Sequence, residues 1–307
     1  MNTLQPFNPA ISPGSARAGI LIVHGGDDPA TLSWLAVCLR HISSRTRWPD
    51  YRIYLWNNNP EDAAIHEMIK INNRINLIQA PPGEKMKHPH AAPLQKLYEL
   101  ALKDKVRYLV TMDTDAFPIQ EDWLRFLIGQ LIEQVPLAGI WRDELHRAIP
   151  PYIHPSCACM TVPFIEEHRL RFDDVDISAG KNLDTLCSFT RAVLENDKRL
   201  FKLVRSNVNQ FHYLMGGVYG DLIYHHGAGS RKGITFWGEE KSEVLKLRNK
   251  TIHLALRNML FTHERQYLDW LTGKTPPGLA GRSHDRGFHE EVERLKEKLL
   301  LLDAGNA

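Results

Sequence analysis

Hydrophobic positions in the first half of the chain follow two alternating periodicities. Short apolar runs typical of buried strands lie at 19–23, 51–56, 75–79, 106–112 and 137–141. Between them, apolar residues recur at helical spacing and predict helices over 29–42, 64–69, 93–101 and 121–135. Alternation of strand and helix over roughly 120 residues predicts an α/β fold with a doubly wound, mostly parallel sheet.

The second half of the chain is less regular and ends in a helical region. We expect a loop at 142–156, a strand of small residues at 156–162, a helix within 181–196 that starts near Asp184, and strands at 200–204 and within 216–224. Helical spacing returns at 241–261, 263–271 and 290–302. We therefore predict a working domain at 1–235 and a helical C-terminal extension at 236–307. The apolar face of the last helix predicts packing, through Val292, Leu295, Leu299 and Leu302.

Small and polar residues follow three of the predicted strands. His24 and Gly25 come after the first, Asn57 and Asn58 after the second, and Asp113 after the fourth. Ligands of doubly wound sheets bind outside the carboxyl ends of the strands. These residues are therefore candidate ligand contacts.

Asp113, Thr114 and Asp115 directly follow the apolar run at 106–112. Two carboxylates one residue apart are costly at such a position unless a positive charge lies between them. A divalent cation with hard oxygen ligands would supply that charge. The alternative is a loop aspartate that caps the next helix, and the polar ends of the neighbouring strands favour the ligand.

Composition narrows the class of protein and its compartment. A net charge of +2 with a pI near 8.3 gives no electrostatic case for a nucleic-acid partner. The four cysteines lack paired zinc spacing and fit a reducing, cytoplasmic compartment. The first residues contain no apolar signal core, and no run is long enough to span a membrane. Peripheral contact with the inner membrane and homo-oligomerisation stay open.

Three stretches of this chain resemble the family 2-type glycosyltransferases of the GT-A fold. They are GILIVHGG, YRIYLWNNN and VRYLVTMDTDAFPIQEDWL, the last of which contains an Asp-x-Asp motif after a strand. GVYGDLIYHHGAGSR resembles the strand and His–Gly–Ser loop that close such domains, so the resemblance covers about residues 19–232. Where the family often has an aspartate after the second strand, this chain has Asn57, Asn58 and Asn59.

The resemblance implies transfer of a hexose from a nucleotide-diphosphate sugar (a UDP- or GDP-sugar) to a hydroxyl acceptor such as a glycan or lipid-linked glycan. It implies a Mn²⁺ or Mg²⁺ ion that stabilises the leaving diphosphate. Asp115 would bind the metal directly, and Asp113 would contact ribose, or the metal through water. His225 would reach metal or phosphate. Ser230, Arg231 and Lys232, with Thr114, would contact the donor.

An inverting transfer needs a general base for the acceptor hydroxyl. By family position Asp184 is the candidate, with Asp174 and Asp176 as alternatives. A helix-capping role for Asp184 stays open. His88 and His90 have no zinc-like partner in the sequence, and we interpret them as ordinary loop residues.

Three other classes of protein remain. A haloacid-dehalogenase-type phosphohydrolase also places Asp-x-Asp after a strand, but its motif opens the domain. A nucleotidyltransferase would have a basic, Gly-rich loop after the first strand, and none follows His24. A non-catalytic sugar-nucleotide-binding protein is the third class.

Overall fold

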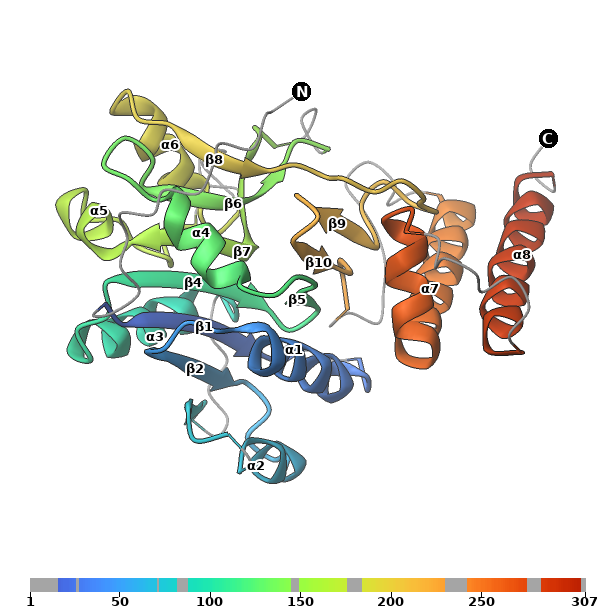
Figure 1. The fold of residues 1–307 in the computed structure, drawn as a ribbon, viewed down its shortest axis with the longest axis horizontal. Coiled ribbons are helices and arrows are strands. Elements are labelled where there is room, and N and C mark those ends of the chain that lie inside the picture. Colours follow the sequence, from blue (N-terminus) through green and yellow to red (C-terminus); the bar gives the residue numbers. More distant parts are fainter. Residues whose placement is uncertain are drawn as a thin grey trace.

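A seven-stranded sheet forms the centre of the described part of the molecule (Figure 1). The structure is a computed structural model that describes residues 16–25, 28–70, 72–81, 88–144, 149–175, 184–229, 242–274 and 283–304. The strand order is β3-β2-β1-β4-β7-β6-β8. These strands are β1 (Ala18–His24), β2 (Tyr51–Asn57), β3 (Ile75–Gln79), β4 (Tyr108–Asp113), β6 (Leu137–Arg142), β7 (Tyr152–Thr161) and β8 (Leu200–Leu203).

Most strand pairs of this sheet are parallel. β1 pairs in parallel with β2 and β4, β2 with β3, and β6 with β8, whereas β7 runs antiparallel to β4 and β6. The predicted α/β fold with a mostly parallel sheet is therefore confirmed.

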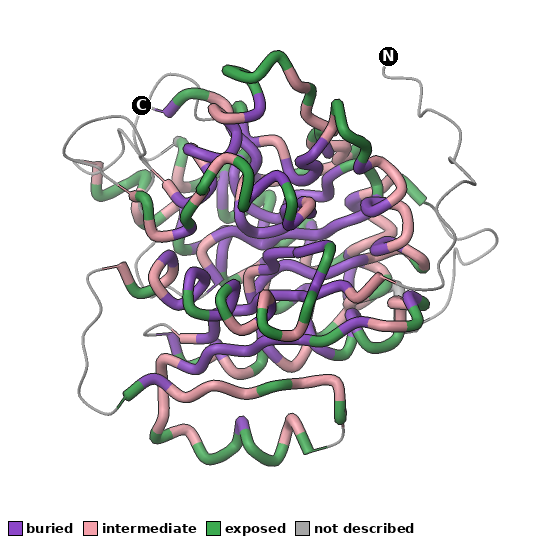
Figure 2. Tube along the Cα trace, turned by 90° about the vertical axis from the view of Figure 1, so that its left-hand side faces the viewer, coloured by how far each residue is buried: buried purple, intermediate pink, exposed green. Residues whose placement is uncertain are grey.

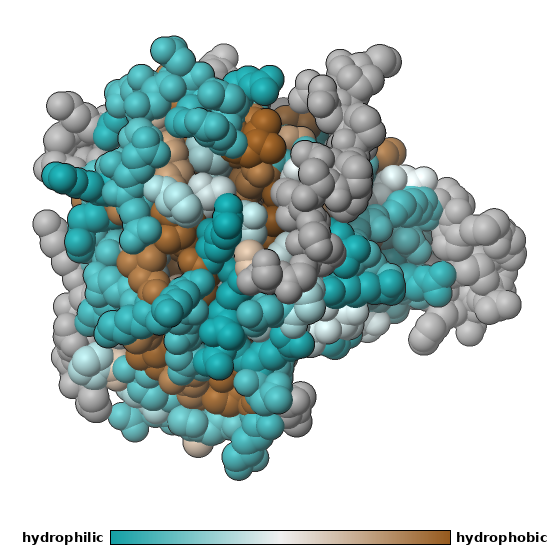
Figure 3. Space-filling view, turned by 60° about the vertical axis from the view of Figure 1, so that its left-hand side comes forward, coloured by the Kyte–Doolittle hydropathy of each residue, from teal (hydrophilic) through white to brown (hydrophobic). Residues whose placement is uncertain are grey.

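Alternating side chains of β1 pack into two hydrophobic layers, one on each face of the sheet. Ile20 and Ile22 pack with α1 (Thr31–Arg45), α2 (Ala64–Ile69) and α4 (Trp123–Gln130), while Leu21 and Val23 pack with the other layer. That layer contains α3 (Ala91–Lys103), α5 (Val162–Glu167) and α6 (Cys187–Glu195). The sheet is thus covered on both faces, and its strands are buried in the middle of the molecule (Figure 2). The face in Figure 3 is mostly hydrophilic, with hydrophobic side chains visible between the polar ones.

A second, antiparallel sheet was not predicted. It has the order β5-β10-β9 and consists of β5 (Ala116–Pro118), β10 (Ile223–His225) and β9 (Gly217–Tyr219). The single strand predicted within 216–224 is wrong, because Gly220 (φ 57°) and Asp221 (φ 53°) adopt left-handed conformations that make a hairpin turn. Pairing of β5 with β10 sets Ala116 opposite His225 and so brings the Asp-x-Asp segment beside the histidine.

Three other boundaries differ from the prediction. α4 ends at Gln130, since Ile132 and Val135 form a β-bridge beyond it. β7 begins at Tyr152, so part of the predicted loop is strand. α6 begins only at Cys187, because Leu186 before it has a left-handed backbone (φ 71°). Asp184 therefore lies in the connection that leads into α6.

The C-terminal helices α7 (Glu243–Leu271) and α8 (Ser283–Ala304) lie side by side at one edge of the molecule (Figure 1). α7 is kinked at His263, where the sequence predicted a break between two helices. Three residues of the predicted apolar face of α8 are buried, namely Val292, Leu295 and Leu299. They belong to a hydrophobic cluster that also holds Trp34 of α1 and Tyr224 of β10. Among the described residues, no helix has the length and apolarity needed to cross a bilayer.

Candidate active site

The polar ends of β1, β2 and β4 lie next to one another. In the register of the sheet, His24 is opposite Asn57 and Val23 is opposite Asp113. The structure therefore gathers the three strand ends that the sequence singled out. β1 is the central strand of the three, which makes its end the middle of this edge.

The first two strand ends contain one buried histidine that has no hydrogen-bond partner in the part of the chain that the structure describes. His24 is fully buried, and neither of its ring nitrogens has a hydrogen-bond partner among the described residues. Burial lowers the pKa of His24 and outweighs the opposing charge of Asp62, so the ring is neutral. By contrast, the Asn57 side chain donates to Gln79 Oε1 at 2.8 Å and the Asn58 side chain to the carbonyl of Pro89 at 2.9 Å. The two asparagine side chains thus hold the loops around Gly25 by hydrogen bonds. The ring nitrogens of His24 have no partner among the described residues.

Asp113, at the end of β4, has histidines around its carboxylate. His90 Nε2 lies 3.1 Å from Asp113 Oδ1, and His225 Nε2 lies 4.0 Å from Oδ2. Burial acts to raise the pKa of Asp113, but the hydrogen bond and the charge of His90 outweigh it and hold the pKa well below its usual range. Burial also acts to lower the pKa of His90, and Asp113 raises it. Asp113 is therefore ionised, and its carboxylate favours the protonated, cationic form of His90.

Asp115 lies deeper and is held by the loop after β10. Its Oδ2 accepts a hydrogen bond from the backbone N–H of Gly229 at 2.8 Å, and its Oδ1 lies 3.6 Å from His225 Nε2. A Cβ on residue 229 would stand 2.6 Å from Asp115 Cβ, so only glycine fits at this contact. Thr114 between the two aspartates is buried. The pairing of β5 with β10 thus fixes Asp115 against the loop that begins at His226.

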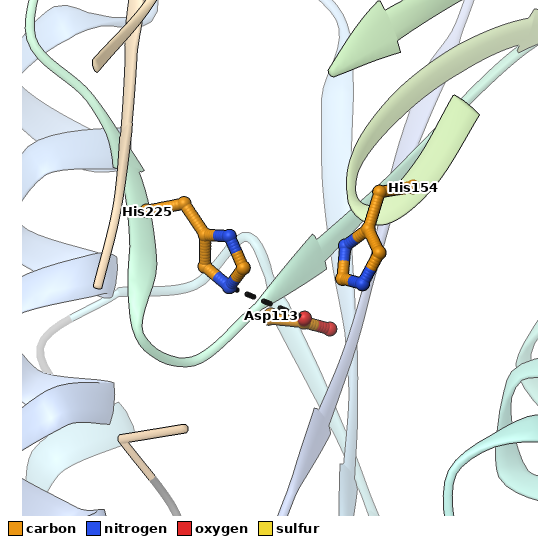
Figure 4. A group of neighbouring side chains, drawn as sticks. All are labelled: Asp113, His154 and His225. Carbon is orange, nitrogen blue, oxygen red and sulfur yellow. Dashed lines mark ion pairs between the residues drawn. The ribbon is translucent and has the colours of Figure 1, made fainter. Parts of the chain in front are cut away.

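Asp113, His154 and His225 form a compact group of donor atoms (Figure 4). One ligand atom from each lies within 4.8 Å of the others, and the residues come from β4, β7 and β10. Burial lowers the pKa of His154 and of His225, so both rings are neutral, the form in which imidazole ligates a metal. His154 Nδ1 is bonded to Ser156 Oγ at 2.8 Å, which leaves its Nε2 on the side of the carboxylates.

This donor set fits a divalent cation. It combines an ionised carboxylate with two neutral imidazoles, and a second carboxylate, Asp115, lies beside His225. Mg²⁺ prefers oxygen ligands in a strict octahedron, whereas Mn²⁺ accepts mixed nitrogen and oxygen ligands. Of the two ions that the sequence suggested, the side chains therefore suit Mn²⁺ better.

Asp184 lies beside His154. Its Oδ2 accepts a hydrogen bond from the Tyr152 hydroxyl and lies 3.8 Å from His154 Nε2, and its Oδ1 accepts from the Thr185 N–H at 2.8 Å. Burial raises the pKa of Asp184 and outweighs the hydrogen bonds that favour the charged form. This carboxylate can therefore take up a proton more readily than an ordinary aspartate.

The remaining candidates lie away from this cluster or outside the described residues. Asp174 is exposed, in the turn after Phe172. Asp176, Ser230, Arg231 and Lys232 fall outside the described residues.

The sequence interpretation missed His90 and His154. His90 does lie in the turn before α3, as the sequence indicated, but its ring contacts Asp113, which the sequence interpretation did not predict. Its position after the third parallel strand was the available signal, since that strand ends at the same edge of the sheet. His154 was assigned to a loop, and only the earlier start of β7 directs it toward Asp113.

Comparisons with known proteins give structural likeness without a sequence relative. No family model matches the chain, and no curated protein sequence matches it. A solved structure of the mannosyltransferase PcManGT from Pyrobaculum calidifontis in complex with GDP-Man and Mn²⁺ is similar with a TM-score of 0.48 at 12% identity, over 97% of this chain and 84% of that one. S. aureus TarS 1–349 is similar with a TM-score of 0.46 at 8% identity, over 89% and 77%. Neither likeness assigns a role to any residue of this chain.

Proposed function

We propose that this protein is a metal-dependent glycosyltransferase, which moves a hexose from a UDP- or GDP-sugar to a hydroxyl acceptor with inversion. The observation that carries the proposal is the pair of carboxylates Asp113 and Asp115 at the end of a central parallel strand, with His225 against both. A diphosphate leaving group needs positive charge of the kind that such a site holds. Residues 1–235 would form the catalytic domain and 236–307 its helical extension.

Asp113, Asp115, His225 and His154 would hold the cation. A Mn²⁺ or Mg²⁺ ion at these ligands would neutralise charge on the departing diphosphate. Before binding, Asp113 is paired with His90, and Asp115 is bonded to Gly229. Gly229 leads directly to Ser230, Arg231 and Lys232, which we assign to the phosphates by their charge and their place in the chain.

The nucleoside would bind at the ends of β1 and β2. His24 has two buried ring nitrogens without a described partner, which supports a contact with a polar ligand. Gly25 has a backbone in the left-handed region (φ 153°), and a Cβ there would meet Asn58 at 2.7 Å. His24, Gly25, Asn57 and Asn58, with Thr114, complete the proposed donor side.

Asp184 would act as the general base. The acceptor oxygen attacks the anomeric carbon, the bond from that carbon to the diphosphate oxygen breaks, and the hydroxyl proton passes to Asp184. Tyr152 and Thr185 orient the carboxylate by donating to its two oxygens. Burial raises the pKa of Asp184, which favours proton uptake by this carboxylate.

The experiment that tests the proposal is a binding assay followed by an activity assay. Thermal stability is measured with UDP and GDP, each with Mn²⁺ and with a chelator, and release of nucleoside diphosphate from UDP- and GDP-sugars is then followed. Metal-dependent stabilisation by one nucleoside diphosphate supports the transferase. Absence of any nucleotide response, together with hydrolysis of phosphomonoesters, would establish the phosphohydrolase instead.

A further inference from the structure

A groove between α7 and α8 stands apart from the candidate active site. It has a volume of about 490 Å³ and is lined from both helices, with Leu247, Thr251, Leu254 and Met259 among the α7 residues and Leu295 among those of α8. We call it the α7–α8 groove. The two helices lie at the edge of the molecule in Figure 1, so the groove belongs to the extension rather than to the sheet.

The groove has an exposed apolar surface. Leu247 is 52% exposed and Leu254 is 40% exposed, although both are large aliphatic side chains. Leu301 is 75% exposed and follows Arg294 and Lys298 at helical spacing, which extends the same face of α8. Exposed aliphatic residues gathered on one face, rather than scattered singly, mark an interaction surface.

Three cations of the groove have no carboxylate partner among the described residues. Lys250, Arg294 and Lys298 line it, and none forms an ion pair with another described residue. The one carboxylate in the lining, Glu291, accepts a hydrogen bond from Asn258. Neighbouring cations outside the groove are paired instead, Lys246 with Glu243, Arg248 with Asp303 and Lys296 with Glu293. Among the described lysines and arginines of α7 and α8 that form no ion pair, all but Arg286 line the groove, so unpaired positive charge gathers around the apolar surface.

We propose that the α7–α8 groove docks the protein onto the surface of a membrane that contains anionic lipid. Aliphatic side chains framed by lysine and arginine match an anionic headgroup above acyl chains, and this combination is typical of helices that lie on a bilayer. A second copy of this chain fits less well, because a symmetric contact would set the three unpaired cations against their own copies. The inference does not depend on the proposed transferase activity.

Vesicle binding tests the proposal without donor or metal. The full chain is sedimented with vesicles of phosphatidylcholine alone and with vesicles that contain equal parts phosphatidylglycerol. We expect binding to the anionic vesicles only, and loss of most of it when salt rises from about 0.05 M to about 0.5 M. Equal binding to neutral vesicles, or no binding to either, would overturn the proposal.

Matched triple variants separate the groove from general charge. Lys250→Gln, Arg294→Gln and Lys298→Gln together should weaken binding by about 100-fold, at about fivefold for each charge. Lys246→Gln, Arg248→Gln and Lys296→Gln remove the same number of charges from the same helices and should weaken it by less than about fivefold. An equal loss in both triples would refute a role for the groove.

The apolar part of the surface has its own test. Leu247→Ser with Leu301→Ser should weaken vesicle binding by about tenfold while leaving its salt dependence unchanged. Leu194→Ser, at a 54% exposed leucine of α6, is the control and should bind as the wild type. Sedimentation equilibrium without lipid completes the set, since a dimer that the groove triple dissociates would identify a second copy as the occupant and reject the membrane.

Discussion

Asp113 and Asp184 both lie near His154, and their surroundings shift their pKa values in opposite directions. Asp113 has a cationic partner in His90 and a pKa well below its usual range. Asp184 has a tyrosine hydroxyl and a backbone N–H as donors, and burial raises its pKa. One carboxylate is thus kept charged and the other is prepared to accept a proton. The same residue type acquires two roles from its neighbours, which separates a candidate metal side from a candidate base side.

The largest effect should come from the metal side. Asp113→Asn removes the ionised ligand between the two imidazoles, so metal-dependent binding of nucleoside diphosphate should disappear and transfer should fall by at least about 10³-fold. Calorimetry with Mn²⁺ and a nucleoside diphosphate measures the binding. The control is Asp174→Asn, at an exposed aspartate, and should behave as the wild type. If Asp113→Asn kept its metal-dependent binding of nucleoside diphosphate, Asp113 would not be a metal ligand.

Substitution of the proposed base, Asp184, should reduce transfer without weakening the binding of nucleoside diphosphate. Asp184→Asn preserves shape but cannot take the acceptor proton, so transfer should fall by about 10²- to 10⁴-fold. Binding of nucleoside diphosphate with Mn²⁺ should stay within about twofold of the wild type, since Asp184 is not among the donor atoms grouped around Asp113. If Asp174→Asn lost transfer instead, the base would be Asp174.

The variant Tyr152→Phe tests the hydrogen bond from the Tyr152 hydroxyl to the Asp184 carboxylate. The hydrogen bond from Tyr152 acts to lower the pKa of Asp184, so Tyr152→Phe should raise that pKa further. The acid limb of the pH–rate profile should move to higher pH, with a loss of about tenfold below it and little change above it. An equal loss at every pH would mean that Tyr152 acts on structure rather than on the carboxylate.

The hydrophobic periodicity of the sequence was sufficient to predict the strands that carry the proposed donor side of the site. The runs ending at His24, Asn57 and Asp113 are buried, and their parallel direction follows from strand–helix alternation. Strand ends that carry polar residues therefore predicted which edge of the sheet holds the candidate site. The kink of α7 at His263 was likewise visible as a break in helical spacing.

The base side was harder to predict because long-range contacts define it. Tyr152 and His154 meet Asp184 only because β7 starts early and α6 starts late. The late start of α6 depends on a left-handed Leu186, a backbone state that the residue type disfavours and that local propensity would not suggest. His90 reaches Asp113 at the sheet edge, and the only signal for that contact in the sequence was its place after the third parallel strand.

The smallest effect concerns the ion pair that keeps Asp113 charged. The raised pKa of His90 means that its contribution to stability is complete below its unfolded value of about 6.5 and is lost as pH rises through the folded pKa. The lowered pKa of Asp113 gives a contribution present above about 3.9 and lost as pH falls. The pair should thus stabilise the metal-free protein most between these values. His90→Gln should cost about 1 kcal/mol or less there, because His90 is partly exposed, and less at higher pH.

Urea unfolding of the chelator-treated protein at about pH 5.5 and about pH 8.5 measures this difference between wild type and variant. His88→Gln is the control, since His88 lies two residues away and forms no ion pair with another described residue. A destabilisation by His90→Gln that is the same at both pH values would mean that His90 contributes packing alone. Asp113 would then not depend on His90 for its charge, and the contrast with Asp184 would no longer rest on this ion pair.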